Sequence, residues 1–285
     1  MAIFDCFIFN NEFDLLDIRL REMSDVVDRF VLVETNETHT GCAKPFHFEM
    51  HRERFSPWAA KIVHVKVTFP KELPPARGKR AREGGWEREH FQREQILSGL
   101  AEAAPDDLVL VSDVDEIVRA DKLREAVGRD IARGRLVIFE VSSHRFFLDR
   151  YYPQENTLLC SRMMERRHLA SPQLMRMTQA RVSKRRKYPT VIGSALVRAK
   201  NFIATGIPLP VAIVPDAGWH FSSMGGIEAF REKLASISEG NIVARNGVEL
   251  VWQRYWENLA PYPRERLPAC VAGGGFDHLL AKDPD

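Results

Sequence analysis

Short apolar runs rich in β-branched residues alternate along this chain with segments whose apolar residues recur at helical spacing. The runs that predict strands cover residues 3–9, 29–34, 61–67, 107–112 and 135–141. Helical spacing follows over residues 13–23, 86–103 and 121–133. This alternation predicts an α/β fold, with a mainly parallel central sheet flanked by helices.

The pattern loosens beyond about residue 142, where helical spacing returns only near residues 227–238 and 247–257. No internal repeat and no clear linker interrupts the sequence. Single domains commonly run to roughly 100–200 residues and can be larger. We therefore expect one domain over residues 1–285, with residues 246–285 as a C-terminal helical extension.

Charge is nearly balanced over the 285 residues but is unevenly distributed. The 41 Lys and Arg residues stand against 39 Asp and Glu residues, which gives a net charge of +2. The segment from Arg162 to Lys200, however, holds 11 Lys and Arg residues and one acid, Glu165. Near-neutrality and the lack of an aromatic-interleaved basic motif argue against a nucleic-acid partner.

The cysteines and the N-terminal sequence bear on the compartment. The four cysteines lie far apart and form no CxxC pair, which favours buried, reduced thiols. The first residues lack a basic region and meet acids too early for a signal peptide. No apolar run approaches the roughly 20 residues that span a bilayer. We expect a cytoplasmic protein, peripheral to the inner face of a membrane if its basic segment contacts lipid.

Two carboxylates directly follow the most apolar of the predicted strands, in the sequence LVLVSDVDEI from Leu108 to Ile117. Ligands of open α/β sheets bind beyond the carboxyl ends of strands, and residues i and i+2 of an extended segment point the same way. Asp113 and Asp115 can therefore converge on one hard divalent cation, which relieves their mutual repulsion. The alternative is that they are ordinary strand-end and helix-capping acids.

A strand that ends in Asp-x-Asp also resembles the haloacid-dehalogenase phosphatases, in which the first Asp is the nucleophile. In that family the motif lies near the start of its domain and precedes a Lys and an acidic pair. Here over a hundred residues precede Asp113, and no acidic pair follows it. A phosphatase-type hydrolase is therefore the lesser alternative.

Several short blocks occur in a recognisable order between residues 3 and 240. They are IFDCFIFNNE (3–12), LLDIR (15–19), VDRFVLVE (27–34), THTG (38–41), KPF (44–46), WERE (86–89), QR (92–93), SDVDEI (112–117) and GWHFS (218–222). Each block is modest, but the ordered set resembles glycosyltransferase family 17, typified by the β-1,4-mannosyl-glycoprotein 4-β-N-acetylglucosaminyltransferases. The forty or so C-terminal residues carry no such block.

The resemblance implies a GT-A type nucleotide-sugar-binding fold, with a nucleotide-binding half over residues 1–118 and an acceptor and metal-completing half over residues 119–245. It implies transfer of a sugar, N-acetylglucosamine in the characterised members, from a UDP-sugar with inversion. Dependence on Mn²⁺ or Mg²⁺ is implied as well. Asp113 and Asp115 match the metal and diphosphate motif, and His220 is the candidate for a late histidine ligand, since imidazole suits manganese beside carboxylates. The alternative for His220 is a structural residue.

The nucleotide-binding candidates come from the same blocks. Glu12 and Glu34 follow predicted strand ends, where a carboxylate can contact a ribose hydroxyl or a base edge. The alternative for Glu12 is an acid at a helix N-terminus that pairs with Arg19. Thr40 and Lys44 lie in the polar loop after the second predicted strand.

Three further residues have predicted roles in the chemistry. Arg93 lies one helical turn from Glu89, so a salt bridge is its default interpretation, with diphosphate binding as the alternative that the resemblance adds. A carboxylate must accept the proton of the acceptor hydroxyl as that hydroxyl attacks the anomeric carbon. Asp216 and Glu228 are the candidates for this base, and each is equally consistent with a loop or helix-cap acid.

The basic segment has several interpretations. Residues 184–187, together with Arg176 and Arg181, are suited to an anionic membrane, a lipid-linked acceptor or the donor diphosphate. The alternative is a solvated loop that balances the acidic remainder of the chain. A non-catalytic anion- or membrane-binding adaptor is therefore the second alternative to a glycosyltransferase. The acceptor and the oligomeric state are not predicted.

Overall fold

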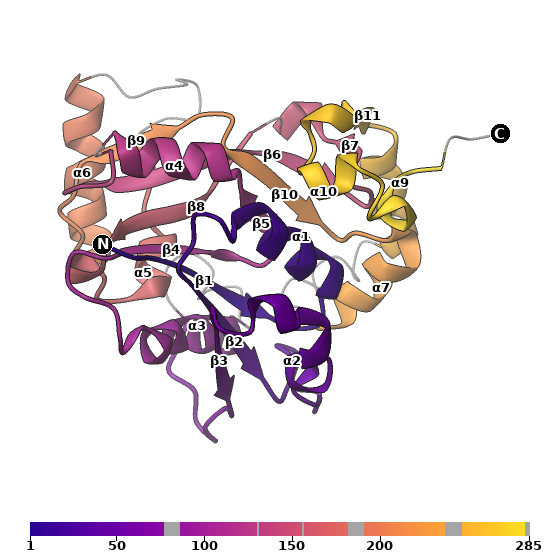
Figure 1. Ribbon diagram of the computed structural model, residues 1–285, viewed down its shortest axis with the longest axis horizontal. Coiled ribbons are helices and arrows are strands. Elements are labelled where there is room, and N and C mark those ends of the chain that lie inside the picture. Colours follow the sequence, from indigo (N-terminus) through magenta and orange to yellow (C-terminus); the bar gives the residue numbers. More distant parts are fainter. Residues whose placement is uncertain (77–85, 130, 156, 182–190, 237–246, 283–285) are drawn as a thin grey trace.

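The computed structural model describes residues 1–76, 86–129, 131–155, 157–181, 191–236 and 247–282. Its strands form one mixed sheet in the hydrogen-bonded order β11-β7-β6-β8-β4-β1-β2-β3, with β9 and β10 attached to β6, and β5 to β10 (Figure 1). The strands are β1 (Ile3–Phe9), β2 (Arg29–Thr35), β3 (Ile62–Val67), β4 (Leu108–Asp113), β5 (Glu116–Val118), β6 (Leu136–Arg145), β7 (Arg150–Tyr151), β8 (Leu158–Glu165), β9 (Val211–Val214), β10 (Gly218–Ser222) and β11 (Ala260–Pro261).

Helices cover this sheet and extend it at one end (Figure 1). They are α1 (Phe13–Met23), α2 (His47–Met50), α3 (Glu87–Glu94), α4 (Ala120–Gly128), α5 (Pro172–Arg176), α6 (Val191–Thr205), α7 (Gly226–Ser236), α9 (Val248–Trp256) and α10 (Ala269–Ala272), with shorter 3₁₀ turns such as η3 (Gln95–Leu100). None of the helices in the described ranges is long and apolar enough to cross a bilayer.

The parallel part of the sheet is built by the N-terminal half of the chain. Strand β1 lies between β2 and β4 and pairs in parallel with both, and β3 pairs in parallel with β2. The chain therefore leaves β1 on one side to form β2 and β3, and later places β4 on the other side. This reversal creates a topological switch point at the carboxyl ends of β1 and β4, where open α/β sheets bind their ligands.

Alternation of side chains along the strands builds an apolar core on each face of the sheet. In β1, Phe7 and Phe9 face a core that includes Leu16 and Leu20 of α1 and residues of α4. Cys6, which precedes Phe7, faces the opposite core, which includes Ile96 and Leu100 of η3 and Met175 of α5. The sheet is thus buried on both faces, which explains why its strands are almost continuously apolar.

The predicted α/β class is confirmed, and the four strands predicted before residue 113 agree with the structure to within one residue at each end. The strand predicted over residues 135–141 is β6, which continues to Arg145. The expected parallel arrangement describes that half. In the C-terminal half, β8 pairs antiparallel with both β4 and β6, so the complete sheet is mixed. Strand β8 escaped prediction because its sequence, LLCSRMME, includes charged residues that the fold pairs: Arg162 bonds to Thr178, and Glu165 caps the Gly134 amide.

The long predicted helix over residues 86–103 is divided into α3 and η3. Gly99 in η3 explains how closely η3 packs on β2, because a Cβ at this position would lie 2.3 Å from Cγ1 of Val31 in β2. The four cysteines are free thiols. Of these, Cys6 is buried as expected, whereas Cys42 is exposed.

Candidate active site

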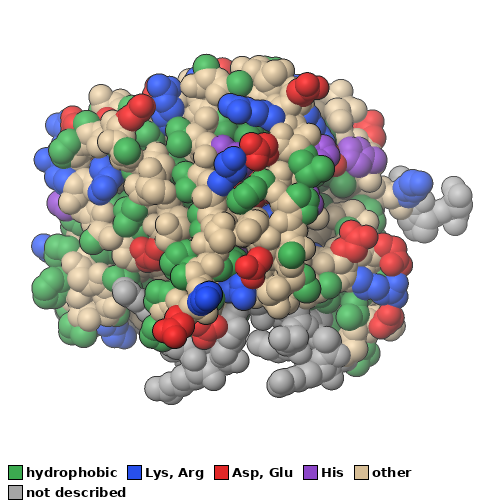
Figure 2. Space-filling model, turned by 90° about the horizontal axis from the view of Figure 1, so that it is seen from below, with side chains coloured by type: hydrophobic (Ala, Val, Ile, Leu, Met, Phe, Trp, Pro, Cys, Tyr) green, Lys and Arg blue, Asp and Glu red, His purple; other side chains and the backbone are tan. Residues whose placement is uncertain are grey.

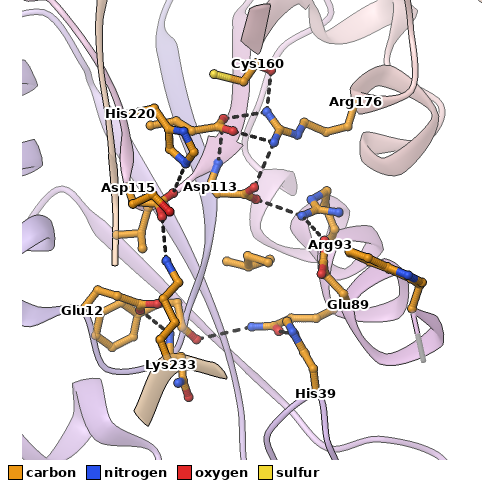
Figure 3. A pocket seen from close by; sticks show the side chains of 18 of the residues that line it. Glu12, His39, Glu89, Arg93, Asp113, Asp115, Cys160, Arg176, His220 and Lys233 are labelled. Atoms are coloured by element: carbon orange, nitrogen blue, oxygen red, sulfur yellow. Dashed lines mark hydrogen bonds and ion pairs between the residues drawn. The ribbon is translucent and has the colours of Figure 1, made fainter. Parts of the chain in front are cut away.

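A cavity of about 930 Å³ lies at the carboxyl ends of β1, β2 and β4, at the switch point of the sheet. Side chains of α3, α5, β8, β10, α7 and α9 complete its walls, so both halves of the chain contribute to it (Figure 3). Charged residues dominate the part nearest the sheet. They include Glu12, Glu89, Arg93, Asp113, Asp115, Glu116, Arg176, His220 and Lys233.

A buried arginine holds the turn that presents the two aspartates. The guanidinium of Arg19, in α1, pairs with Asp5 of β1, and both side chains are fully buried. The Arg19 guanidinium also donates to the backbone carbonyls of Asp113 and Glu116, at 3.0 and 2.9 Å. Because β4 ends in this turn, Arg19 fixes the direction in which the carboxylates leave the sheet. The predicted alternative pairing of Arg19 with Glu12 is wrong, since Asp5 is its partner.

The Asp113 carboxylate is bound by two arginines from different helices (Figure 3). Its Oδ1 atom accepts from Arg93 of α3 at 2.9 Å, and its Oδ2 atom accepts from Arg176 of α5 at 2.9 Å. Arg176 also donates to both oxygens of Glu116, at 2.6 and 2.7 Å. Burial alone would raise the pKa of Asp113, but the guanidinium groups of Arg176 and Arg93 outweigh it and hold this pKa far below its usual range.

The Asp115 carboxylate faces the other side of the pocket. Its Oδ2 atom accepts from the ammonium of Lys233, in α7, at 3.0 Å, and its Oδ1 atom lies 3.6 Å from Nε2 of His220, in β10. Burial would raise the pKa of Asp115, but Lys233 and His220 outweigh it and lower that pKa strongly. Burial would lower the pKa of Lys233, and Asp115 reverses this effect and raises it.

The predicted metal ligands are therefore brought together only in part. Asp115 and His220 offer an oxygen and a nitrogen to the same space, and the buried Nδ1 of His220 has no hydrogen-bond partner among the described residues. This donor pair fits Mn²⁺ chemically. Both oxygens of Asp113, by contrast, are bound to arginines, and within the described ranges no three His, Cys, Asp or Glu side chains form a metal-binding cluster.

Arg93 takes the first of the two roles that the sequence left open, and diphosphate binding stays a prediction. It forms the expected salt bridge with Glu89, at 2.9 Å, and also reaches Asp113 and the side-chain oxygen of Gln173. Burial would lower the pKa of Arg93, but Asp113 and Glu89 together raise it. The guanidinium is therefore a permanent positive charge in the wall of the pocket.

Three of the predicted nucleotide-binding residues lie outside the pocket lining, whereas Glu12 lines it. The fully buried carboxylate of Glu34 accepts from the backbone amides of His47 and Phe48, where α2 begins, and pairs with Lys44 and His64. Lys44 is thereby used within the loop. The hydroxyl of Thr40 donates to the backbone carbonyl of Ala235, at 2.9 Å. Glu34 and Lys44 thus stabilise the first half of the fold.

Neither candidate for the base lies in the pocket lining. Asp216 precedes β10 at the end of this strand away from Ser222, which lines the pocket, and pairs with Arg266 at 3.1 Å. Glu228 lies in the first turn of α7 and pairs with Arg231 at the helix surface. Asp216 and Glu228 are close in sequence to His220 and Lys233. The direction of β10 and the helical phase of α7 nevertheless place their carboxylates outside the pocket.

Sequence reasoning missed the full importance of Lys233, Glu116 and Arg176. Lys233 carried no signal, because a single lysine in an amphipathic helix is ordinarily a solvated residue. Glu116 was visible only as the third acid of the motif. Arg176 was visible as part of the basic segment, and the structure assigns it to the pocket. Arg181 of the same segment pairs with Glu140 at 3.2 Å, and residues 184–187 lie outside the described ranges.

Comparison with known proteins finds a family similarity in the N-terminal part of the chain. The model of glycosyltransferase family 17 matches residues 1–126, which confirms the predicted resemblance over that part of the chain. The β-1,4-mannosyl-glycoprotein 4-β-N-acetylglucosaminyltransferase of Homo sapiens is 36% identical over 118 residues, which are 39% of this chain and 21% of the human protein. The corresponding Mus musculus protein is 35% identical over the same shares. The match thus spans about a fifth of these relatives.

Solved structures give weaker similarities over more of the chain. The inositol-1-phosphate CTP transferase of T. maritima has a TM-score of 0.40 at 12% identity, covering 84% of this chain and 96% of that one. The glucosyl-3-phosphoglycerate synthase of M. tuberculosis has a TM-score of 0.36 at 15% identity, covering 77% and 71% respectively. Similarity at this level carries no conclusion about function.

Proposed function

We propose that this chain, whose residues 1–126 match glycosyltransferase family 17, is a metal-dependent inverting glycosyltransferase. In this proposal it moves a sugar from a UDP-sugar to a hydroxyl of a glycan or glycolipid. N-acetylglucosamine is the proposed sugar because the curated relatives are named for its transfer. The observation that carries the proposal is the pair of strand-end carboxylates that meets three cationic side chains in a cavity at the switch point of the sheet.

Arg93, Arg176 and Lys233 are the groups that we assign to the donor diphosphate. Guanidinium groups bind phosphate oxygens through paired N–H donors, and an ammonium binds them as a point charge. All three cations already project into the pocket, where carboxylate oxygens accept their hydrogen bonds. Diphosphate oxygens would take over as acceptors without a change in the protonation of these groups.

Asp115 and His220 are the residues that we assign to the metal. Asp113, also predicted as a ligand, has both oxygens bound to arginines, so we assign it to holding Arg93 and Arg176 in the pocket. A bound Mn²⁺ or Mg²⁺ would stabilise the negative charge that develops on the departing UDP. A divalent cation and a donor diphosphate carry opposite charges. They can therefore enter together, the cation toward the carboxylates and the phosphates toward the basic groups, and leave the charge of the pocket balanced.

Glu12 and Glu89 replace Asp216 and Glu228 as candidates for the base, because both line the pocket. Among the described hydrogen bonds, Glu12 uses only its Oε2 atom, which accepts from the backbone amides of Asn10 and Asn11. Glu89 binds Arg93 through Oε1. A remaining carboxylate oxygen can accept the proton of the acceptor hydroxyl as it attacks the anomeric carbon.

The wall opposite the parallel strands is suited to the acceptor. It is formed by α7 and α9 and places Phe230, Leu234, Val251 and Tyr255 in the cavity lining. The guanidinium of Arg145 lies 4.1 Å from the centre of the Tyr255 ring. Aromatic and aliphatic groups beside a cation can contact both the apolar face and the hydroxyls of a sugar ring.

The test is release of UDP from UDP-N-acetylglucosamine in the presence of Mn²⁺, measured for the wild-type chain, Asp115→Asn and Asp216→Asn. We expect release by the wild type and by Asp216→Asn, which alters a carboxylate outside the pocket, and loss of release in Asp115→Asn. A panel of other nucleotide sugars with and without metal, read by thermal shift, identifies the donor, since a ligand of the folded state raises its apparent stability. Failure of every nucleotide sugar to bind would overturn the proposal.

The structure disfavours the phosphatase alternative. A nucleophilic Asp113 needs an oxygen that can approach phosphorus, whereas both oxygens of this carboxylate accept hydrogen bonds from arginines. We expect no metal-dependent hydrolysis of a generic phosphate ester such as p-nitrophenyl phosphate. Hydrolysis that is lost in Asp113→Asn would restore this alternative.

A further inference from the structure

Helix α6 presents its apolar face to solvent. The side chains of Val191, Ile192, Leu196, Phe202 and Ile203 are 90%, 75%, 49%, 58% and 83% exposed. The other large apolar side chains that are exposed in the described part of the chain are scattered over distant segments, at Met1, Met50, Leu250 and Trp256. Single exposed apolar residues are ordinary, whereas a continuous group of them marks an interaction surface.

Helical spacing places these exposed side chains on one stripe. At 100° per residue, the exposed apolar residues of α6 fall within an arc of about 140°. The side of α6 that packs on the protein is the more polar one, with Val197, Asn201 and Thr205 buried. The Asn201 side chain bonds to both the backbone amide and the backbone carbonyl of Gln179, at 2.7 and 2.9 Å. The helix is therefore held against the protein by its more polar side, whereas a surface helix ordinarily packs its apolar side on the core.

Positive charge borders the apolar stripe on both sides. Arg198 and Lys200 fall at the two edges of the arc on the same helical projection, and α6 contains no acidic residue. The helix also begins within the segment from Arg162 to Lys200, which carries 11 Lys and Arg residues and one acid. Long basic side chains at the edges of an apolar face are typical of helices that lie in a lipid interface, where the apolar stems contact lipid and the charges reach the headgroups.

The position of α6 leaves this face accessible in the described structure. The helix stands at the left edge of the molecule in Figure 1, packed on β9 and far from α7 and α9. Hydrophobic and basic side chains also gather at the left of Figure 2, the side on which α6 lies. Ala204, near the end of α6, belongs to the lining of the candidate active site, so contact through this helix would hold the pocket close to the bound surface.

We propose that the outer face of α6 docks onto an anionic lipid surface, with Val191, Ile192, Leu196, Phe202 and Ile203 inserted at the level of the headgroups and Arg198 and Lys200 on anionic lipids. The combination of an exposed apolar stripe and cationic borders favours this occupant over a second copy of the chain, whose α6 would bring like charges together. The proposal does not depend on the proposed glycosyltransferase activity.

The experiment is sedimentation of the full chain with vesicles of phosphatidylcholine that contain either no or 30% phosphatidylserine, at low and high salt. We expect binding that requires phosphatidylserine and weakens with salt. In the double variant Ile192→Ser/Ile203→Ser the affinity should fall at least tenfold. Lys200→Glu should reduce the affinity for anionic vesicles several-fold. All these side chains are exposed, so circular dichroism and thermal unfolding should match those of the wild type and exclude misfolding as the cause.

The matched control is Met50→Ser/Leu250→Ser, which removes two exposed apolar side chains from other elements and should leave vesicle affinity unchanged. Absence of binding to anionic vesicles, or binding that the α6 variants leave unaltered, overturns the proposal. So does a concentration-dependent dimer, measured by analytical ultracentrifugation, that Ile192→Ser/Ile203→Ser dissociates while vesicle binding is absent. In that outcome the occupant of the α6 face is a second copy of the chain.

Discussion

The pocket and the outer face of α6 are two surfaces of opposite construction. In the pocket, each of the charges of Asp113 and Asp115 is already matched by a partner from another element. On α6, apolar side chains project into solvent without a partner among the described residues. A ligand of the pocket must therefore replace hydrogen bonds and ion pairs that already exist. A partner of α6 needs only to cover apolar side chains that are in contact with water. Changes in the pocket should alter stability and ligand binding together, and changes on α6 should alter docking alone.

The largest effect should follow removal of the charge beneath the pocket, in Arg19→Met. The change leaves Asp5 buried without its partner and frees the turn that carries Asp113. Breaking a buried ion pair from one side costs about 3–5 kcal/mol. Urea unfolding should show a loss of this size, together with loss of UDP release. A loss below about 1 kcal/mol would show that the turn does not depend on Arg19, and Lys200→Glu on α6 should be unchanged in the same assay.

Asp115→Asn should reduce sugar transfer by roughly 100-fold or more, because preorganised charges that stabilise a transition state are commonly worth that factor. The rate is measured as UDP release, with Asp216→Asn and Glu228→Gln as controls outside the pocket. Activity equal to that of the wild type in Asp115→Asn would remove this carboxylate from the site. Glu12→Gln and Glu89→Gln, assayed beside it, should separate the two candidate bases, since only loss of the base should lower kcat without weakening donor binding.

Lys233→Met should weaken donor binding about tenfold, which corresponds to about 1.4 kcal/mol. The methionine keeps much of the aliphatic length of the side chain but removes the ammonium that binds Asp115. Calorimetric titration with UDP-N-acetylglucosamine measures the change, and Lys233→Arg serves as the charge-conserving control. Lys233→Met should also bind Mn²⁺ more tightly than the wild type when no donor is present, because the lysine no longer occupies the Asp115 carboxylate. Unchanged donor affinity would contradict the assignment of Lys233 to the diphosphate.

How far the sequence predicts this molecule differs between its halves for a physical reason. In the first half of the chain β1, β2 and β3 are each followed by a helix and are neighbours in the sheet in their order along the chain. Strand β8, helix α6 and strand β10 depend instead on long-range pairing. Their sequences contain Arg162, Asn201 and His220, which are polar residues whose partners lie in other segments of the chain. Local patterns cannot register such contacts.

The same difference governs the site. The strand-end motif predicts Asp113 and Asp115, because two carboxylates after a buried strand are informative by themselves. Lys233 lies 118 residues beyond Asp115, and nothing local distinguishes it from a surface lysine. Asp216 and Glu228 were wrongly placed in the pocket for the converse reason, since nearness in sequence to His220 does not fix the direction of a side chain.

Acid should destabilise the fold through the buried His144, which belongs neither to the pocket lining nor to the outer face of α6. Burial lowers the pKa of His144 in β6 to about 3, below the roughly 6.5 of an unfolded histidine. The unfolded chain therefore binds a proton at His144 that the folded chain does not bind. The contribution to the free energy of unfolding that is present above pH 6.5 is lost as the pH falls toward 3. At pH 5.5 the loss is about 1.4 kcal/mol. The pH dependence of urea unfolding in His144→Gln should be flatter by this amount, and an identical pH dependence would contradict the prediction.

The smallest effect should come from the α6 variant Ile192→Ser/Ile203→Ser in the pocket assays. Its donor affinity in solution should lie within about twofold of the wild type, since both side chains are largely exposed to solvent on α6 and neither lines the pocket. Calorimetric titration measures this directly. A loss of affinity of tenfold or more in the absence of lipid would show that the two surfaces are coupled through the fold, and that changes on α6 do not alter docking alone.

Calorimetric titration of the wild-type chain with UDP-N-acetylglucosamine, in the presence and absence of Mn²⁺, measures whether the pocket is a metal-dependent donor site. We expect one site per chain whose affinity rises when Mn²⁺ is present, and whose metal dependence disappears in Asp115→Asn while Asp216→Asn retains it. Binding that is absent for this donor and for a panel of other nucleotide sugars, or that persists unchanged in Asp115→Asn, would contradict this expectation.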